Sequence, residues 1–148
     1  MKYFAYGSNM DPNRMSERDV HFSERRCAIL KGYTLRFNKV ASKNQREGKG
    51  NIIRKEGGIV EGVLYEMPDS DLTKLDLAEG YPDHYDHLPV EVELEDGAKV
   101  QALTYVAQPN MIREGLKPTR EYLNHYLVAQ GILSESYLQK LRSIETLN

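Results

Sequence analysis

The sequence predicts a single α+β domain, 1–148, whose sheet is curled and mostly antiparallel. Three observations support this fold class. Strand-like runs occupy the front and middle of the chain, helical patterns lie between them and at the end, and no repeat, low-complexity tract or linker interrupts the 148 residues. A chain of this length buries roughly 68–70% of its unfolded surface, so it can fold without disulfides.

The charge balance indicates which class of molecule the protein binds, and the apolar and cysteine content indicate where it is located and whether it contains disulfides. The 20 basic and 22 acidic residues nearly cancel, whereas nucleic-acid or membrane-surface binding needs concentrated positive charge. We therefore expect a small-molecule partner, with no nucleic acid and no membrane. The chain has no apolar run of about 18 residues and no leader peptide, so we expect a cytoplasmic protein. The single cysteine, Cys27, is interpreted as a small apolar strand residue.

The first expected strand, Tyr3 to Tyr6, ends in a turn with features of an anion site. Its aromatic residues favour a strand, and Gly7 permits backbone angles closed to other residues. Asp11 and Pro12 are typical of a helix start. A loop between a strand and a helix start can present several backbone N–H groups to one negative group. The alternative is a plain tight turn, because Gly-Ser-Asn turns are common.

The next part of the chain predicts short strands separated by glycine turns. We expect strands at 26–30, 33–37, 52–53 and 59–67. Lys31-Gly32 is interpreted as a hairpin turn, and Gly57-Gly58 separates the last two strands. The basic segment Val40 to Asn51 has no helical or strand period. We interpret it as a mobile loop, either simply solvated or able to attract or cover an acidic substrate.

A mid-chain helix is expected from Asp69 or Ser70 to a stop at Gly80. Its apolar positions, Leu72, Leu75 and Ala78, share one face, and helical spacing places Glu79 on that buried face as well. A carboxylate there is unfavourable, and it also opposes the helix dipole. A residue that is unfavourable both for its burial and for its position in the helix is often a functional-site residue. The alternative is a frayed last turn that exposes Glu79 to solvent.

The segment Asp83 to His87 holds two histidines and two carboxylates, which raises the question of a metal site. An extended backbone would place His84 and His87 on opposite faces, and no other Cys or His cluster completes a zinc set, so we expect no metal. A hairpin follows, with strands at 88–94 and 99–106. Helices are expected at 120–130, with Gly131 as the stop, and from Ser134 onward.

Two separated motifs, Tyr6-Gly7-Ser8-Asn9-Met10 and Glu79-Gly80-Tyr81-Pro82, resemble the γ-glutamylcyclotransferase superfamily. The resemblance extends over nearly the whole chain. It implies a small β-barrel-like sheet with flanking helices, a cavity that binds a γ-glutamyl group through the Tyr6–Met10 loop, and a catalytic glutamate matching Glu79.

Two tyrosines, Tyr85 and Tyr105, fall near positions where family members place pocket tyrosines. One departure is His87, where many members carry an arginine. That difference leaves the pocket wall and the leaving-group preference open.

The chemistry that the resemblance implies also suits these residues. The α-amine of a γ-glutamyl compound can attack its own γ-carbonyl, which closes a 5-oxoproline ring and expels an amine or amino acid without a metal, cofactor or covalent nucleophile. Correct orientation of such an intramolecular reaction is worth about 7–11 kcal/mol. The backbone N–H groups of Gly7, Ser8 and Asn9 would hold the α-carboxylate. Glu79 would act as general base and then general acid, with a pKa raised by burial.

A different class of function is the alternative: a non-catalytic module that binds amino acids or anions on the same fold. The sequence leaves the oligomeric state open. It also leaves the leaving group open, because the contacts would come from Val40–Asn51 and Gln108–Lys117, which contain no recognisable motif.

Overall fold

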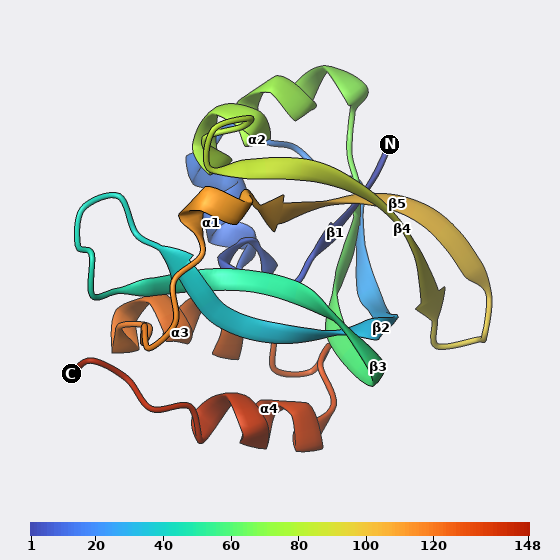
Figure 1. The fold of residues 1–148 in the computed structure, drawn as a ribbon. Helices are drawn as coiled ribbons and strands as arrows, with labels where there is room; N and C mark the ends of the chain where they lie inside the picture. Colours follow the sequence, from blue (N-terminus) through green and yellow to red (C-terminus); the bar gives the residue numbers. More distant parts are fainter.

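A closed five-stranded barrel forms the centre of the protein, seen here in a computed structural model that describes all 148 residues (Figure 1). The strands are β1 (Lys2–Ala5), β2 (Glu24–Val40), β3 (Gly48–Glu66), β4 (Tyr85–Leu94) and β5 (Lys99–Ala107). Their order around the barrel is β1-β3-β2-β4-β5. Every pair is antiparallel except β1 with β5, which closes the barrel in parallel. The expected mixed, mostly antiparallel sheet is confirmed.

The long hairpin of β2 and β3 corrects the four short strands expected from the sequence. Lys31-Gly32 is no turn, because β2 continues through it. Instead the register shifts from Lys31 opposite Ile59 to Tyr33 opposite Arg54, which leaves residues 55–58 opposite Gly32 in an irregular bulge. Gly32 and Gly57 have φ of +87° and +77°, a conformation that favours glycine in bulges as well as in turns.

The basic segment 40–51 is also shorter as a loop than expected. Val40 pairs with Gly48 and Lys39 with Lys49, so only residues 41–47 join the two strands. This connection projects beyond the barrel at one end of the hairpin (Figure 1). The paired strands therefore bring residues of the segment up against the body of the protein.

Four short helices flank the barrel: α1 (Pro12–Glu17), α2 (Leu72–Glu79), α3 (Arg120–Leu127) and α4 (Glu135–Arg142). Three of them have side-chain N-caps, provided by Asp11, Thr119 and Ser134. Helix α2 instead follows the 3₁₀ turn η2 (Asp69–Asp71) without a side-chain cap, so the start expected at Asp69 or Ser70 is too early. Two further 3₁₀ turns are η1 (Ser8–Met10) and η3 (Pro109–Met111).

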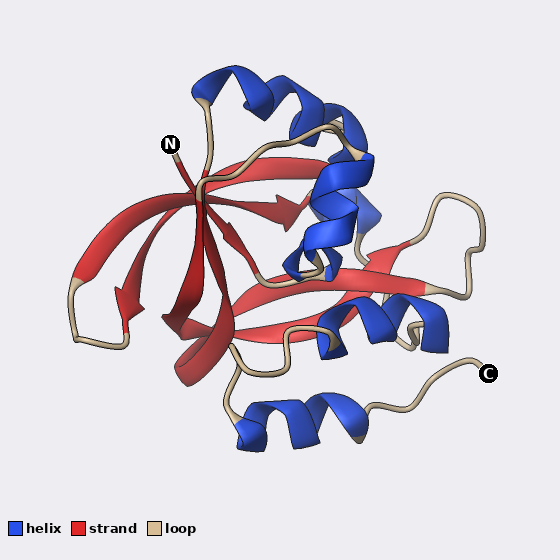
Figure 2. Cartoon of the chain, turned by 180° about the vertical axis from the view of Figure 1, so that it is seen from behind, coloured by secondary structure: helices blue, strands red, loops and turns tan.

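The buried side chains form two clusters on either side of β1. One fills the barrel and is mostly aliphatic, with Leu30 and Val92 as members beside the aromatic Phe4 and Tyr6. The other lies between the barrel and the helices and includes Met10 and Leu123. Figure 2 shows α3 and α4 beneath the long hairpin, where they cover this second cluster. All the helices are too short or too polar to cross a bilayer.

Candidate active site

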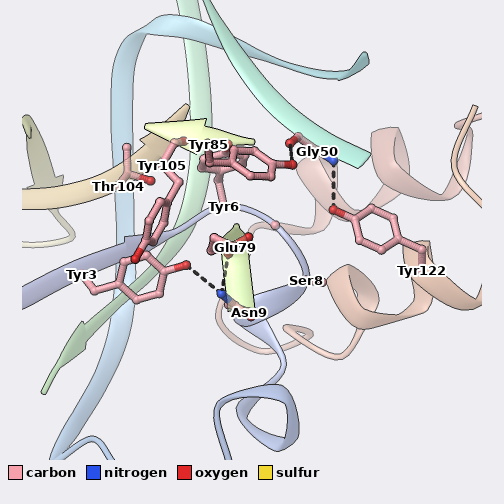
Figure 3. A pocket seen from close by; sticks show the side chains of 11 residues that line it. Tyr3, Tyr6, Ser8, Asn9, Gly50, Glu79, Tyr85, Thr104, Tyr105 and Tyr122 are labelled. Atoms are coloured by element: carbon pink, nitrogen blue, oxygen red, sulfur yellow. Dashed lines mark hydrogen bonds between the residues drawn. The ribbon is translucent and has the colours of Figure 1, made fainter. Parts of the chain in front are cut away.

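A small cavity of about 30 Å³ lies where β1 ends. This volume is far below the roughly 300–1,000 Å³ typical of small-molecule sites, so a ligand would also have to occupy the space next to it. Five of the ten tyrosines line it (Figure 3). The lining residues are Tyr3, Tyr6, Gly7, Ser8, Asn9, Gly50, Glu79, Tyr85, Thr104, Tyr105 and Tyr122. They come from four strands, two helices and the η1 turn, so only the folded chain assembles this cavity, which we call the inner cavity.

Hydrogen bonds to its carbonyl oxygens hold the η1 loop in place, whereas the backbone N–H groups at its start have no partner in the protein. The Tyr65 hydroxyl donates to the Asn9 carbonyl oxygen at 2.7 Å, and Arg25 Nη2 donates to the Met10 carbonyl oxygen at 2.8 Å. By contrast, the backbone N–H groups of Gly7, Ser8 and Asn9 donate to no protein acceptor. Free N–H groups of this kind can bind an anion.

The structure favours glycine at position 7 because of a close contact and not because of the backbone angles expected from the sequence. Its φ is −114°, which other residues adopt readily. A Cβ at this position would instead lie 3.3 Å from the Tyr126 hydroxyl and 3.9 Å from the Tyr122 hydroxyl. The glycine therefore allows α3 to pack closely against the loop.

Glu79 is the last residue of α2, and Gly80 terminates the helix in the left-handed conformation with φ of +69°. Asn9 Nδ2 donates to Glu79 Oε1 at 2.9 Å and to the Tyr3 hydroxyl at 3.0 Å. Figure 3 shows this carboxylate in the middle of the tyrosines. The helix is less regular than expected, since Ala78 is exposed while Leu75 is fully buried. The structure thus brings Glu79 and the η1 loop together.

Burial among the tyrosine rings raises the pKa of the Glu79 carboxyl above its ordinary value. Arg18, Arg14 and Lys39 act against this shift, and so does the hydrogen bond from Asn9. The desolvation effect is the largest of these, so the pKa remains raised. A carboxyl in this state is suited to both accepting and returning a proton near neutral pH.

Gly50 joins the two sides of the inner cavity. Its carbonyl oxygen accepts from the Tyr85 hydroxyl at 2.7 Å, and its N–H donates to the Tyr122 hydroxyl at 2.9 Å. A Cβ on Gly50 would lie 2.1 Å from the Tyr126 hydroxyl. Any side chain there would displace α3 or β3, so this wall depends on a glycine.

The Tyr105 hydroxyl donates to Asp76 Oδ1 at 2.7 Å, and His87 Nε2 lies 2.7 Å from the same oxygen. The His87 ring also stacks on Tyr81, with centroids 3.8 Å apart. His87 therefore links α2 to β4, and Tyr105 links α2 to β5. Tyr6 completes this wall by donating to the Tyr105 carbonyl oxygen at 2.8 Å.

The two histidines of the 83–87 segment have separate partners. His84 Nδ1 lies 2.9 Å from Lys39 Nζ, whereas His87 bonds to Asp76. The structure contains no group of three or more His, Cys, Asp or Glu side chains arranged to hold a metal ion. Cys27 lies half-buried in β2, where burial raises the pKa of its thiol to about 11. It is therefore a neutral thiol at neutral pH.

The structure does not bring every expected site residue to the inner cavity. Met10, expected in the substrate loop, is fully buried in the hydrophobic cluster, because it closes the 3₁₀ turn with its side chain inward. Four lining residues were not identified from the sequence: Tyr3, Gly50, Thr104 and Tyr122. The composition gives one signal for part of this set, since the chain has ten tyrosines against three phenylalanines and no tryptophan. Their partners lie far away in the chain, as in the Thr104 hydroxyl donating to the Phe4 carbonyl oxygen at 2.7 Å.

The sequence of this chain is similar to those of known proteins. Residues 3–127 match the family described as gamma-glutamyl cyclotransferase, AIG2-like. YkqA of Bacillus subtilis (strain 168) is 37% identical over 100 residues, which cover 66% of this chain and 34% of that protein. The match therefore spans about a third of the length of that relative.

Two further comparisons cover nearly the whole chain. The gamma-glutamylcyclotransferase of Homo sapiens is 28% identical over 151 aligned positions, or 97% of this chain and 78% of the human protein. A solved structure of a gamma-glutamyl cyclotransferase is similar with a TM-score of 0.87 and 26% identity, covering 99% of this chain and 89% of that one. The fold of this chain therefore agrees with that of the solved structure over nearly its whole length.

Proposed function

This chain belongs to the gamma-glutamyl cyclotransferase, AIG2-like family, and on that basis we propose that it converts γ-glutamyl compounds to 5-oxoproline and a free amine. The observation that carries the proposal is the position of Glu79. Its carboxylate bonds to Asn9 at 2.9 Å inside a tyrosine-lined cavity, beside a loop with free N–H groups. A proton-transfer group and an anion-binding loop thus line the same cavity.

In the proposed complex, the N–H groups of Gly7, Ser8 and Asn9 bind the α-carboxylate of the substrate. This contact holds the γ-glutamyl chain folded, with its α-amine against its own γ-carbonyl carbon. Orientation of this kind can contribute about 7–11 kcal/mol to an intramolecular reaction. The buried tyrosine walls leave the substrate few other conformations.

Glu79 then moves one proton through the reaction. Its carboxylate takes a proton from the α-ammonium, and the freed amine nitrogen attacks the γ-carbonyl carbon to form the ring C–N bond. As the tetrahedral centre collapses, the bond to the leaving nitrogen breaks, and Glu79 returns the proton to that nitrogen. The ring nitrogen still carries two hydrogens after the attack, and it gives one of them as a proton to the expelled amine, so the products are a neutral lactam and an ammonium ion. Nothing is oxidised or reduced, and Glu79 ends in its starting state. The raised pKa of Glu79 suits this double role.

A substrate panel tests the proposal. We expect 5-oxoproline from γ-glutamyl dipeptides or γ-glutamyl amines, and none from α-glutamyl dipeptides of the same composition, which lack the γ-amide. Binding of γ-glutamyl compounds without any product would instead favour a non-catalytic binding module. Product from both isomers would point to a hydrolytic or chemical background.

A further inference from the structure

A second, larger cavity of about 250 Å³ opens beside the first. We call it the vestibule. It shares Ser8, Glu79, Tyr85 and Tyr122 with the inner cavity. Because the two cavities share these residues, a group attached to the γ-carbonyl of a substrate in the inner cavity would extend past Glu79 into this space.

The vestibule is strongly basic. Arg14, Arg18, Lys39 and Lys49 line it, and Glu79 is the one carboxylate among its lining residues. Two of the cations have carboxylate partners at its edge: Arg14 lies 3.8 Å from Glu17, and Lys49 lies 2.9 Å from Glu47.

The other two cations form no ion pair. Arg18 Nη1 donates to the Arg14 carbonyl oxygen at 3.2 Å, and its Nε is buried without a hydrogen-bond partner. Lys39 Nζ is 2.9 Å from His84 Nδ1 and 5.4 Å from the centroid of the Tyr85 ring. Neither contact supplies a negative charge. The vestibule thus contains two cations without an ion pair, and Glu79 is the one carboxylate that shares this cavity with them.

Lys39 is the more unusual of the two, because its exposed fraction is only 5%. Lysine is rarely this buried unless it is paired. Desolvation lowers the pKa of Lys39, Lys49 lowers it further, and only the neighbouring Glu79 carboxylate acts in the other direction. An anionic ligand in the vestibule would supply the missing partner and stabilise the charged lysine.

We propose that the vestibule is the leaving-group subsite and that Lys39 and Arg18 select leaving groups bearing carboxylates, with dicarboxylic amino acids favoured. This inference rests on the proposed cyclotransferase function and specifies its substrate class. One carboxylate can pair with the buried Lys39, and a second can reach the half-buried Arg18. The contacts come partly from the 40–51 segment, through Ala41, Ser42 and Lys49, but not from 108–117.

Matched substrates test the charge preference. Comparing kcat/KM for γ-glutamyl-alanine and γ-glutamyl-alaninamide isolates the first carboxylate. We expect the acid to be about 10- to 100-fold better, the usual value of a hydrogen bond to a charged group. γ-Glutamyl-glutamate and γ-glutamyl-glutamine differ only in the second carboxylate, for which we expect a gain of about two- to fivefold. Equal values within each pair would overturn the inference while leaving the cyclotransferase function intact, whereas no 5-oxoproline from any substrate would overturn both.

Variants distinguish a loss of leaving-group selectivity from a general loss of activity. Lys39→Met should reduce the preference for γ-glutamyl-alanine over γ-glutamyl-alaninamide, measured as the ratio of kcat/KM, at least about tenfold; any effect of the lost charge on Glu79 should act equally on both substrates. Lys39→Arg should restore part of the affinity, and Arg18→Met should remove the advantage of γ-glutamyl-glutamate over γ-glutamyl-glutamine. Lys43→Met is the control, because Lys43 is exposed in the same segment and does not line the vestibule. Equal losses on acid and amide substrates, with an unchanged melting temperature, would refute a selective role for Lys39.

Discussion

The two cavities that meet at Glu79 differ in how their polar groups are satisfied. In the inner cavity the tyrosine hydroxyls already have protein partners: Tyr6 donates to Tyr105, Tyr85 donates to Gly50, and Tyr3 accepts from Asn9. In the vestibule, the cations Arg18 and Lys39 form no ion pair. A wall whose groups are bonded to one another is preorganised for one geometry, whereas unpaired charges await a ligand.

The difference suggests that the reaction and the choice of leaving group lie in separate parts of the molecule. Changes in the inner cavity should then affect every substrate alike, and changes in the vestibule should affect only substrates of one charge. Substitutions in the inner cavity test whether the two functions are separate in this way.

The largest effect is expected for Glu79→Gln. This variant keeps the shape and an acceptor for Asn9 but cannot carry a proton, so kcat should fall about 10²- to 10⁴-fold. The fall should be the same for γ-glutamyl-alanine and γ-glutamyl-alaninamide, and binding of the unreacted substrate should persist. Steady-state kinetics and calorimetric binding on one preparation measure both. Full activity in a well-folded variant would remove Glu79 from the mechanism.

Gly7→Val should have the next largest effect. The new side chain would meet the Tyr126 hydroxyl, which lies 3.3 Å from the Cβ position, and such overpacking typically costs about 1–3 kcal/mol of stability. Displacement of the loop N–H groups by about 1 Å could reduce the rate about 10²-fold. Melting temperature and kcat/KM report the two effects, and a variant with normal values of both would show that the loop does not depend on this contact.

The stability of Glu79→Gln should depend on pH. Because folding raises the pKa of Glu79, the folded state resists ionisation, and the ionised carboxylate destabilises the fold once the pH exceeds the unfolded pKa. The free energy of unfolding of the variant should therefore exceed that of the parent at neutral pH, by about 1.4 kcal/mol for each unit of the pKa shift. In acid below the unfolded pKa, the two proteins should be equally stable. Melting curves from pH 3 to 8 measure the difference. A lower melting temperature at pH 7 would indicate that Glu79 is a stabilising partner of the cations instead.

The smallest effect is expected for Ser8→Ala. The Ser8 hydroxyl makes no hydrogen bond in the structure, and its proposed contribution is its backbone N–H. Turnover should change by little more than about twofold, in line with the roughly 0.5 kcal/mol of a surface substitution. If Ser8→Ala abolished product formation while Gly7→Val retained it, the serine would act as a nucleophile and the anion-binding role of the loop would be wrong.

Short-range patterns predicted much of the fold. The hairpin of β4 and β5 and the caps at Asp11 and Ser134 agree with the sequence, because each depends on residues within a few positions. Glu79 was also found, since a carboxylate at the buried end of a helix breaks local rules and matches a family motif. Gly32 and Gly57 were misread, because a positive φ suits a turn and a bulge equally, and only the pairing of two long strands decides between them.

Contacts between distant segments are what the tertiary structure alone decided. Gly50 and Tyr122, which form one wall of the inner cavity, are 72 residues apart. Lys39 lies on a strand whose pattern gives no sign that its ammonium is buried beside Glu79. The sequence by itself determined which residues could transfer a proton or end a helix, because those properties belong to the residue and its neighbours. Which of them share a cavity, and with what charge around them, depends on barrel closure and on the packing of α1, α2 and α3 against it.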